Sequence, residues 1–328
     1  MAHWYRISWV TYLLWPLSWL FGLIASIRRF AFRRGWLASV HAGVPTIVVG
    51  NLSVGGNGKT PVVIWLCEWL TQAGYRPGVI SRGYGGQAPH YPFQLNETST
   101  GAQAGDEPVL IHQRTGCPVV VSPKRIDAAL HLIQHCNVNV IISDDGLQHY
   151  ALKRDIEIVV VDGERRYGNG LLLPAGPLRE GCSRLQSVDF IVNNGGTAQP
   201  GEYAMRLRPA AAKKVNGDAG DYVMAINGTK INACAGIGHP PRFFKTLTEL
   251  GFELQKQQGF ADHYAFNVAE LSKLNQDYPL FMTEKDAVKC RDFELDQAWY
   301  IPVSADLPVV LTEQIVTKLK EINHHARS

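Results

Sequence analysis

A glycine-rich turn between an apolar run and a helical pattern constrains the fold of this chain more than any other feature. Residues 44–50 are mostly apolar and predict a short buried strand. The turn Asn51–Thr60 follows and ends in Gly-Asn-Gly-Lys-Thr. An amphipathic helical pattern starts at Pro61, where a missing N–H costs nothing. Strand, glycine-rich turn, Lys-Thr and helix together form the arrangement of a Walker A phosphate-binding loop.

The turn has the properties that phosphate binding requires. Glycines permit backbone angles at which successive N–H groups point at phosphate oxygens, and the helix N-terminus adds the positive end of its dipole. In this pattern the lysine reaches the β- and γ-phosphates, and the threonine hydroxyl binds Mg²⁺. Because Ser53 replaces the first glycine of the general pattern, an incidental glycine-rich turn is the alternative interpretation. The candidate nucleotide-binding residues are Gly55, Gly56, Asn57, Gly58, Lys59 and Thr60, and Thr60 is also a candidate metal ligand.

Two later apolar runs end in acidic residues. Residues 138–145 end in Asp144 and Asp145, and residues 156–162 end in Asp162. In a parallel sheet both ends emerge at the carboxyl edge, beside the phosphate-binding loop. We favour Asp144 and Asp145 as metal ligands, because the polar sequence Gly-Leu-Gln-His follows them. For Asp162 a structural role in a turn is as good an interpretation as a functional one.

The N-terminal segment has the composition of a membrane-associated helix. No charged residue occurs from Ile7 to Ile27, a length that can span a bilayer. Pro16 interrupts the run and aromatic residues are spread along it, so we favour a helix that lies in the interface over a single span. A buried helix of a soluble protein is the third alternative. Small and weakly polar residues also trace a stripe at helical spacing: Ser8, Thr11, Ser18, Gly22 and Ser26.

The residues after this segment indicate which side of a membrane the chain occupies. Four arginines within seven residues are suited to anionic headgroups and would keep the rest of the chain cytoplasmic: Arg28, Arg29, Arg33 and Arg34. The six cysteines are scattered without a C-x-x-C pair, which fits a reducing cytosol and indicates neither a disulfide framework nor a zinc site. A formal charge of +3 is too small a bias to indicate nucleic-acid binding.

The order of strand and helix patterns predicts an α/β protein with two domains. Patterns alternate from Val44 to Val192, which indicates a doubly wound, mostly parallel P-loop sheet. Polar, Gly/Pro-rich sequence follows Asn193, and a second β-α pattern begins at Ala233. We therefore expect a membrane helix with its basic flank in residues 1–34, a core domain in 35–220, and a smaller α/β domain in 221–328 that closes over a cleft.

Two absences narrow the class of P-loop protein. A GTP switch carries N-K-x-D after a later strand, but residues 190–195 read Phe-Ile-Val-Asn-Asn-Gly. Dimerising ATPases of another P-loop class carry a lysine just before Gly-Gly, where this chain has Val54. The sequence therefore favours ATP as the nucleotide and argues against a switch.

Seven sequence blocks stand out along the chain: residues 50–61, 81–86, 105–108, 144–149, 173–180, 235–240 and 282–287. Together and in this order they resemble the tetraacyldisaccharide 4'-kinase family, in which Ser53 is normal. That family phosphorylates the lipid A precursor disaccharide. The resemblance implies transfer of the γ-phosphate of ATP, with Mg²⁺, to the 4'-hydroxyl of a tetraacyl disaccharide 1-phosphate at the cytoplasmic face of a bacterial inner membrane. The resemblance implies neither binding of nucleic acid nor an obligate protein partner.

The resemblance also implies roles for individual residues. Asp106 matches the family's catalytic base and His263 its partner histidine, whereas helix N-capping by Asp106 is the structural alternative. The candidate substrate-binding residues are Arg82, Tyr84, Arg125, Gln148 and His149, and Glu180 is a further candidate ligand of Mg²⁺. Two other functions remain open at this point: a kinase of another membrane-bound saccharide or isoprenoid, and a membrane-tethered regulatory ATPase.

Overall fold

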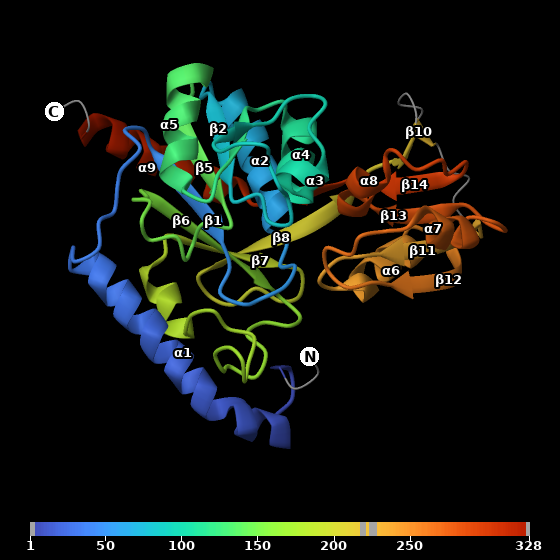
Figure 1. Cartoon of the computed structure of the whole chain (residues 1–328), viewed down its shortest axis with the longest axis horizontal. Helices are drawn as coiled ribbons and strands as arrows, with labels where there is room; N and C mark the ends of the chain where they lie inside the picture. The colour runs from blue at the N-terminus through green and yellow to red at the C-terminus, as the bar shows by residue number, and fades with distance from the viewer. Residues whose placement is uncertain (1–3, 217–220, 223–227, 326–328) are drawn as a thin grey trace.

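The computed structural model describes residues 4–216, 221–222 and 228–325, and they form two sheets with an N-terminal helix beside the larger one (Figure 1). The larger sheet has the strand order β15-β8-β7-β6-β1-β5-β2-β4-β3. Its strands pair in parallel except for β3 and β15 at the two edges. The bounds are β1 Thr46–Gly50, β2 Pro77–Ser81, β3 Phe93–Gln94, β4 Val119–Val121, β5 Val140–Asp144, β6 Ile156–Asp162, β7 Phe190–Asn194, β8 Glu202–Pro209 and β15 Val303–Asp306.

Helices cover both faces of the larger sheet, so its central strands are buried throughout. One face packs against α2 (Lys59–Gln72), α4 (Asp106–Thr115) and α9 (Val309–His325). The other face packs against α5 (Arg125–Cys136) and the loops that follow β1, β5 and β6. The short helix α3 (Gly101–Ala104) precedes α4, and a 3₁₀ helix spans Cys182–Ser187.

The parallel arrangement brings the sequence-predicted residues to one edge. β1 lies between β5 and β6, so the turn after β1 is flanked by the carboxyl ends of both strands. The predicted doubly wound sheet is therefore confirmed, and it positions the phosphate-binding loop beside Asp144 and Asp162.

The second sheet forms a smaller lobe with the strand order β10-β9-β14-β13-β11-β12. α6 packs on one face of this sheet, and α7 and α8 pack on the other. The strands are β9 Ala212–Lys214, β10 Asp221–Tyr222, β11 Lys230–Ala235, β12 Glu253–Gly259, β13 Leu280–Thr283 and β14 Ala298–Ile301. The helices are α6 Pro240–Glu249, α7 Val268–Leu274 and α8 Glu284–Cys290.

Two antiparallel connections join the lobe to the larger sheet. β8 leads into the lobe and β15 leads back, and the Ala210 N–H donates to the Pro302 carbonyl at 2.9 Å between them. The sequence division assigned all of residues 221–328 to the lobe, but β15 pairs with β8, and apolar side chains of α9 pack in the core of the larger domain. These last elements lie with the larger domain because α9 covers sheet surface there. The expected boundary at Gly220 lies outside the described residues.

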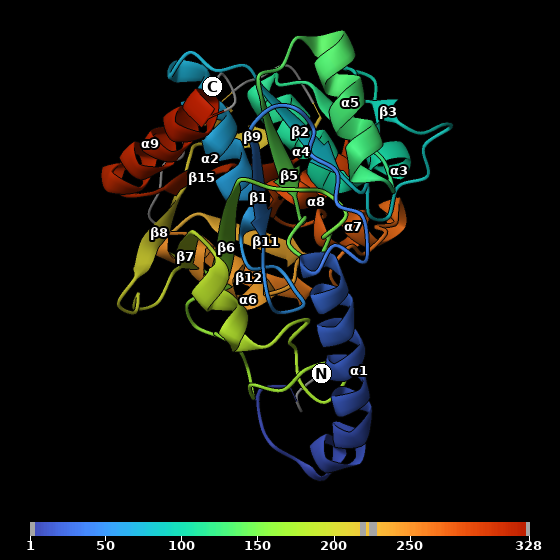
Figure 2. The ribbon, with the colours of Figure 1, turned by 90° about the vertical axis from the view of Figure 1, so that its left-hand side faces the viewer.

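Helix α1 (Trp9–Arg33) runs along the loops at one side of the larger sheet and extends past them in both views (Figures 1 and 2). It is long and apolar enough to cross a membrane, with a mean hydropathy of 1.6 over its best window. Thr11 and Ser18 are its buried residues, and the Ser18 hydroxyl donates to the Leu172 carbonyl at 2.6 Å. The middle of the small, polar stripe therefore faces the protein, where a Cβ on Gly22 would lie 2.6 Å from the Leu172 side chain, whereas Ser26 at its end is exposed. The large apolar side chains remain exposed, with 76% of Trp9 and 74% of Trp19 accessible.

Candidate functional site

The conformation of the turn after β1 is fixed by glycines and by two side-chain amides, one from the turn and one from β7. Gly55 and Gly58 have φ angles of 111° and 91°, which a residue with a side chain rarely adopts. Asn57 donates to the Ser53 hydroxyl at 2.9 Å, and Asn194 donates to the Asn57 carbonyl at 3.0 Å. Ser53, which stands in place of the pattern's first glycine, therefore has a structural role, because its hydroxyl accepts a hydrogen bond from within the loop.

Lys59 lies at the start of α2 and faces the acids at the end of β5. Its Nζ is 3.5 Å from Asp145, and Arg179 Nη1 lies 3.2 Å from the same carboxylate. Burial acts to raise the pKa of Asp145, but Lys59 and Arg179 outweigh burial and hold that pKa below its usual value. Asp145 is consequently an anion beside the phosphate-binding loop.

Asp144 is a carboxylate buried at the end of β5. It is 1% exposed, and within the described ranges neither of its carboxylate oxygens has a hydrogen-bond partner. Burial, together with the nearby Glu107 and Asp145, raises the pKa of Asp144 to about 7. An orphaned carboxylate of this kind fits a divalent cation, because Mg²⁺ prefers oxygen ligands and would supply the missing charge.

Asp162 differs from Asp144 because two arginines neutralise it. Arg165 lies 2.9 Å and Arg242 3.1 Å from its Oδ2, and its Oδ1 accepts the Arg165 N–H at 2.8 Å. Of the two interpretations left open for Asp162, these contacts support the structural one. Arg242 belongs to α6 of the smaller lobe, so Asp162 helps to join the two units.

Asp106 and His263 come from different units and lie close together. His263 Nδ1 is 3.7 Å from Asp106 Oδ2, and the ring of Tyr84 packs edge-on against His263 with centroids 5.2 Å apart. Asp106 is the first residue of α4, whose N-cap is Gly105 and has no side-chain cap bond. The N-capping alternative for Asp106 is therefore not what the structure shows.

Close backbone packing fixes the start of α4. A Cβ on Gly105 would lie 2.7 Å from the Tyr84 carbonyl oxygen, and one on Gly86 would lie 2.5 Å from the Gly105 nitrogen. The loop that contains Arg82 and Tyr84 therefore rests directly on the residue before Asp106. This contact explains why glycines occur in both blocks.

Arginines surround His149 at the end of the loop after β5. Burial first, then the positive charge of Arg125, Arg154, Arg28 and Arg82, lowers the pKa of His149 to about 4. Arg125 is 3% exposed and donates to the Asp144 carbonyl at 3.4 Å, while Arg82 is exposed. This neutral histidine and the arginines around it form a positively charged surface next to the acids.

Gln148 and Glu180 lie in one network behind that surface. Gln148 Nε2 donates to the Asn51 carbonyl at 3.1 Å and to Glu180 Oε2 at 3.3 Å. Glu180 also accepts from the Tyr150 hydroxyl and lies 3.8 Å from Arg184. These contacts connect the phosphate-binding loop to the loop before the 3₁₀ helix.

Sequence reasoning missed the charged residues that link these groups. Glu107 accepts from Lys285 Nζ at 2.9 Å. Burial acts to raise the pKa of Glu107, but Lys285 and Lys59 outweigh burial and lower it. Glu107 therefore interacts with the phosphate-loop lysine on one side and with the smaller lobe on the other. Glu107 and Lys285 lie inside blocks 105–108 and 282–287, so the signal was present, but only their neighbours were interpreted.

The smaller lobe rests on the phosphate-binding loop itself. A Cβ on Gly238 would lie 2.3 Å from the Gly56 nitrogen, so the two backbones are in direct contact. Arg165 donates to the carbonyls of both, at 2.6 Å to Gly56 and 3.1 Å to Gly238. A change in the position of the lobe would therefore also change the conformation or position of the phosphate-binding loop.

A family model described as tetraacyldisaccharide-1-P 4'-kinase matches residues 10–320. This chain belongs to that kinase family. Proteins named tetraacyldisaccharide 4'-kinase from Tolumonas auensis and Aeromonas salmonicida are 55% and 57% identical to it. These matches cover 98% and 97% of this chain, and 98% and 96% of the two relatives.

A solved structure agrees with the family assignment. The crystal structure of Aquifex aeolicus LpxK in complex with ATP matches with a TM-score of 0.76 and 26% identity, over 95% of this chain and 98% of that one. The resemblance drawn from the seven sequence blocks is thus confirmed, as is the fold class. The chain is a tetraacyldisaccharide 4'-kinase family member along nearly its whole length.

Proposed function

We propose that this protein transfers the γ-phosphate of ATP to the 4'-hydroxyl of a tetraacyl disaccharide 1-phosphate. One observation carries the proposal: Lys59 and the acids after β5 interact through Glu107 with the Asp106–His263 pair. A nucleotide-phosphate cradle and a candidate base for a hydroxyl therefore belong to one connected site. The names of the relatives and the ATP complex of the Aquifex aeolicus protein support this choice of donor and acceptor.

The phosphate-binding loop supplies the groups for the nucleotide. Backbone N–H groups of Gly55 to Gly58 and the α2 N-terminus are suited to the phosphates, with Lys59 as their cation. Mg²⁺ would be held by Thr60, Asp144 and Asp145, with Glu180 as a further ligand, and would neutralise charge on the β- and γ-phosphates. The strongest support for this metal site is the buried carboxylate of Asp144, which has no hydrogen-bond partner among the described residues.

Asp106 has the role of a general base in this proposal. A carboxylate is a sufficient base because the transition state of phosphoryl transfer is loose and the hydroxyl proton leaves late. His263 faces Asp106 from the smaller lobe and can orient it. Because Asp106 and His263 come from different units, the site is complete only while the lobe stays against the larger domain, and this closed arrangement would exclude water.

The lipid acceptor explains the remaining features. The exposed apolar face of α1 is suited to the membrane surface, and Arg28 at its basic end donates to the Gln148 carbonyl at 3.4 Å. The membrane contact and the positively charged surface around His149 therefore adjoin each other, as an acylated sugar with a 1-phosphate requires. We propose that Arg82, Tyr84, Arg125, Gln148 and His149 bind this sugar, and that the protein lies on the cytoplasmic face of the inner membrane.

A phosphate-transfer assay tests the proposal. The purified protein is mixed with ATP labelled at the γ-phosphate, Mg²⁺ and the disaccharide lipid in detergent micelles. We expect label in the lipid and little hydrolysis when the lipid is absent. Hydrolysis without labelled lipid would favour a regulatory ATPase, and label in an isoprenoid or another saccharide lipid instead would favour the other kinase. Lys59→Met, which removes the loop's cation, is the inactive control.

A further inference from the structure

Helix α8 of the smaller lobe presents two lysines to the Asp106–His263 pair. α8 packs against α4, the helix that starts with Asp106. Lys285 and Lys289 are four residues apart and therefore lie on one face of α8. Lys289 Nζ is 2.9 Å from Asp286 and 3.9 Å from Asp106. The proposed function assigns no role to either lysine.

Lys285 binds groups from both units of the protein. Its Nζ donates to Glu107 of α4 at 2.9 Å and to Asp262 of the lobe at 3.3 Å. Only 15% of its side chain is exposed. Burial acts to lower the pKa of Lys285, but Glu107 and Asp262 outweigh burial and raise it. Lys285 is therefore an ammonium ion at any pH at which the protein works.

The charge of Lys285 determines which nitrogen of His263 carries a proton. Lys285 Nζ lies 3.3 Å from His263 Nε2. An ammonium group has three donors and no acceptor, so Nε2 must be the accepting nitrogen. In the neutral ring the proton is then on Nδ1, the nitrogen that faces Asp106 Oδ2 at 3.7 Å. His263 also has a φ of 59°, a strained angle for a histidine, so its ring is held by its surroundings.

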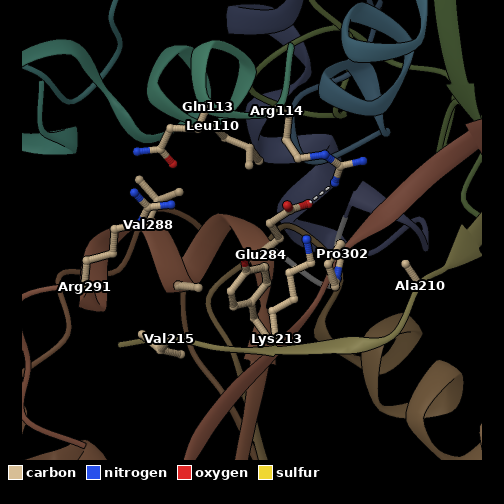
Figure 3. Close-up of a pocket in the computed structure, with 12 residues that line it drawn as sticks. Leu110, Gln113, Arg114, Ala210, Lys213, Val215, Glu284, Val288, Arg291 and Pro302 are labelled. Carbon is tan, nitrogen blue, oxygen red and sulfur yellow. Dashed lines mark hydrogen bonds and ion pairs between the residues drawn. The ribbon is translucent and has the colours of Figure 1, made fainter. Parts of the chain in front are cut away.

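Glu284, the first residue of α8, anchors the helix to α4 at a second point. Glu284 pairs with Arg114 at 2.7 Å on the wall of a cavity of about 260 Å³ between the two units (Figure 3). Arg114 also donates to the Ser304 hydroxyl of β15 at 3.0 Å. α8 is thus attached to α4 at both ends of α4, so Lys285 occupies a fixed position.

We propose that Lys285 is a positioning residue for phosphoryl transfer: its ammonium group joins Glu107 to the lobe and holds His263 in the tautomer whose Nδ1–H faces Asp106. This inference rests on the proposed function and adds to it the group that orients the histidine. Lys285 acts on phosphoryl transfer through His263, with Glu107 holding the ammonium group in place, and it has no contact with the nucleotide.

Two variants at position 285 and one control test this role in the full-length protein. Lys285→Gln keeps a polar side chain, and Lys285→Met removes all donors. Lys256→Met is the control. It removes an exposed ion pair of the same lobe, in which Lys256 Nζ lies 3.7 Å from Asp277 Oδ2. We expect each Lys285 variant to lower kcat about 100-fold, the loss typical of a misplaced catalytic group, with KM for ATP within about twofold. The control keeps its kcat.

A double-mutant cycle separates positioning from a general structural role. In a His263→Ala background, Lys285→Gln should lower kcat by less than about threefold, because its effect passes through the missing ring. Equal losses in the two backgrounds would overturn the proposal. So would an unchanged kcat in Lys285→Gln while the wild-type protein transfers phosphate.

Nitrogen NMR of histidine-labelled protein gives a readout that does not need activity. The nitrogen signals of His263 are assigned by their disappearance from the spectrum of His263→Ala. We expect the Nδ1–H tautomer in the wild-type protein and a shift toward Nε2–H in Lys285→Gln. An Nε2–H tautomer in the wild-type protein would contradict the inference even if the protein is a kinase. Conversely, NMR could show the Nδ1–H tautomer while the transfer assay gives no labelled lipid. That result would refute the proposed function but leave the Lys285–His263 contact standing.

Discussion

Replacing Gly238 by alanine should separate the smaller lobe from the phosphate-binding loop. The added Cβ would lie 2.3 Å from the nitrogen of Gly56 and 3.0 Å from its Cα. Both neighbours are backbone atoms that cannot rotate away. Gly238 does not have a positive φ, so alanine fits its backbone conformation and the effect comes from the contact alone.

The size of the effect follows from the overlap. Ordinary carbon contacts are about 3.5–4.0 Å, so the lobe or the loop must move by about 1 Å or more. Overpacking of this kind typically costs about 1–3 kcal/mol. If that energy acts on closure of the lobe, the closed population falls about 5- to 150-fold. A displacement of about 1 Å at the catalytic groups gives a similar loss of about 100-fold in rate.

The assay is steady-state transfer of labelled phosphate to the disaccharide lipid, with melting temperature as the measure of folding. Gly259→Ala is the matched control in the same lobe, because its Cβ would lie at an ordinary 3.4 Å from Pro240. We expect kcat/KM of Gly238→Ala to fall between tenfold and a hundredfold while Gly259→Ala is unaffected. A Gly238→Ala enzyme within about twofold of wild type would refute the idea that this contact matters for transfer.

Three further predictions concern other parts of the site. Asp106→Asn and His263→Ala should each lower kcat about 10²–10⁴-fold, the usual contribution of general base catalysis, while a fluorescent ATP analogue still binds. Loss of nucleotide binding would contradict the assignment of these two residues to the hydroxyl and not to the nucleotide. His149 has a pKa of about 4 in the folded protein, below the usual value of 6.5. Between these two pH values the unfolded chain therefore binds one proton more than the folded protein, so the free energy of unfolding falls as the pH drops from 6.5 to 4. His149→Gln should therefore lose less melting temperature between pH 7 and pH 5 than wild type, and an equal loss would contradict the low pKa. Trp19→Glu, at a side chain that is 74% exposed, should leave the melting temperature unchanged and weaken sedimentation with anionic vesicles at least about tenfold. Unchanged binding would show that the exposed face of α1 is not the membrane contact.

The parts of the site that the sequence predicted are those with local signals. The turn before Lys59 and the acids at the end of β5 each sit in a short motif with a fixed place relative to a strand. Parallel pairing of β1 with β5 then brings them together without further information. Asp106 and His263 had no such local signal, and only the family resemblance connected two residues so far apart in the chain.

The remaining features depended on tertiary contacts that no local pattern shows. The stripe on α1 was visible in the sequence, but the side of the helix that faces the protein was not: Thr11 and Ser18 are buried, and Ser18 donates to the Leu172 carbonyl. The return of β15 and α9 to the larger domain was missed for the same reason, since β15 pairs with the distant strand β8 and α9 packs in a core made of residues much earlier in the chain. Lys285 was interpreted as part of a motif, and only the folded lobe shows that it meets Glu107.

Phosphorus NMR of the reaction product tests the central claim most directly. The disaccharide 1-phosphate is incubated with ATP, Mg²⁺ and wild-type protein, then purified and compared with the product from Lys59→Met. We expect a second phosphomonoester signal, coupled to the proton at the 4'-position, with the wild-type protein only. A product that keeps the single 1-phosphate while ATP is consumed, or that carries the new phosphate at another hydroxyl, would contradict it.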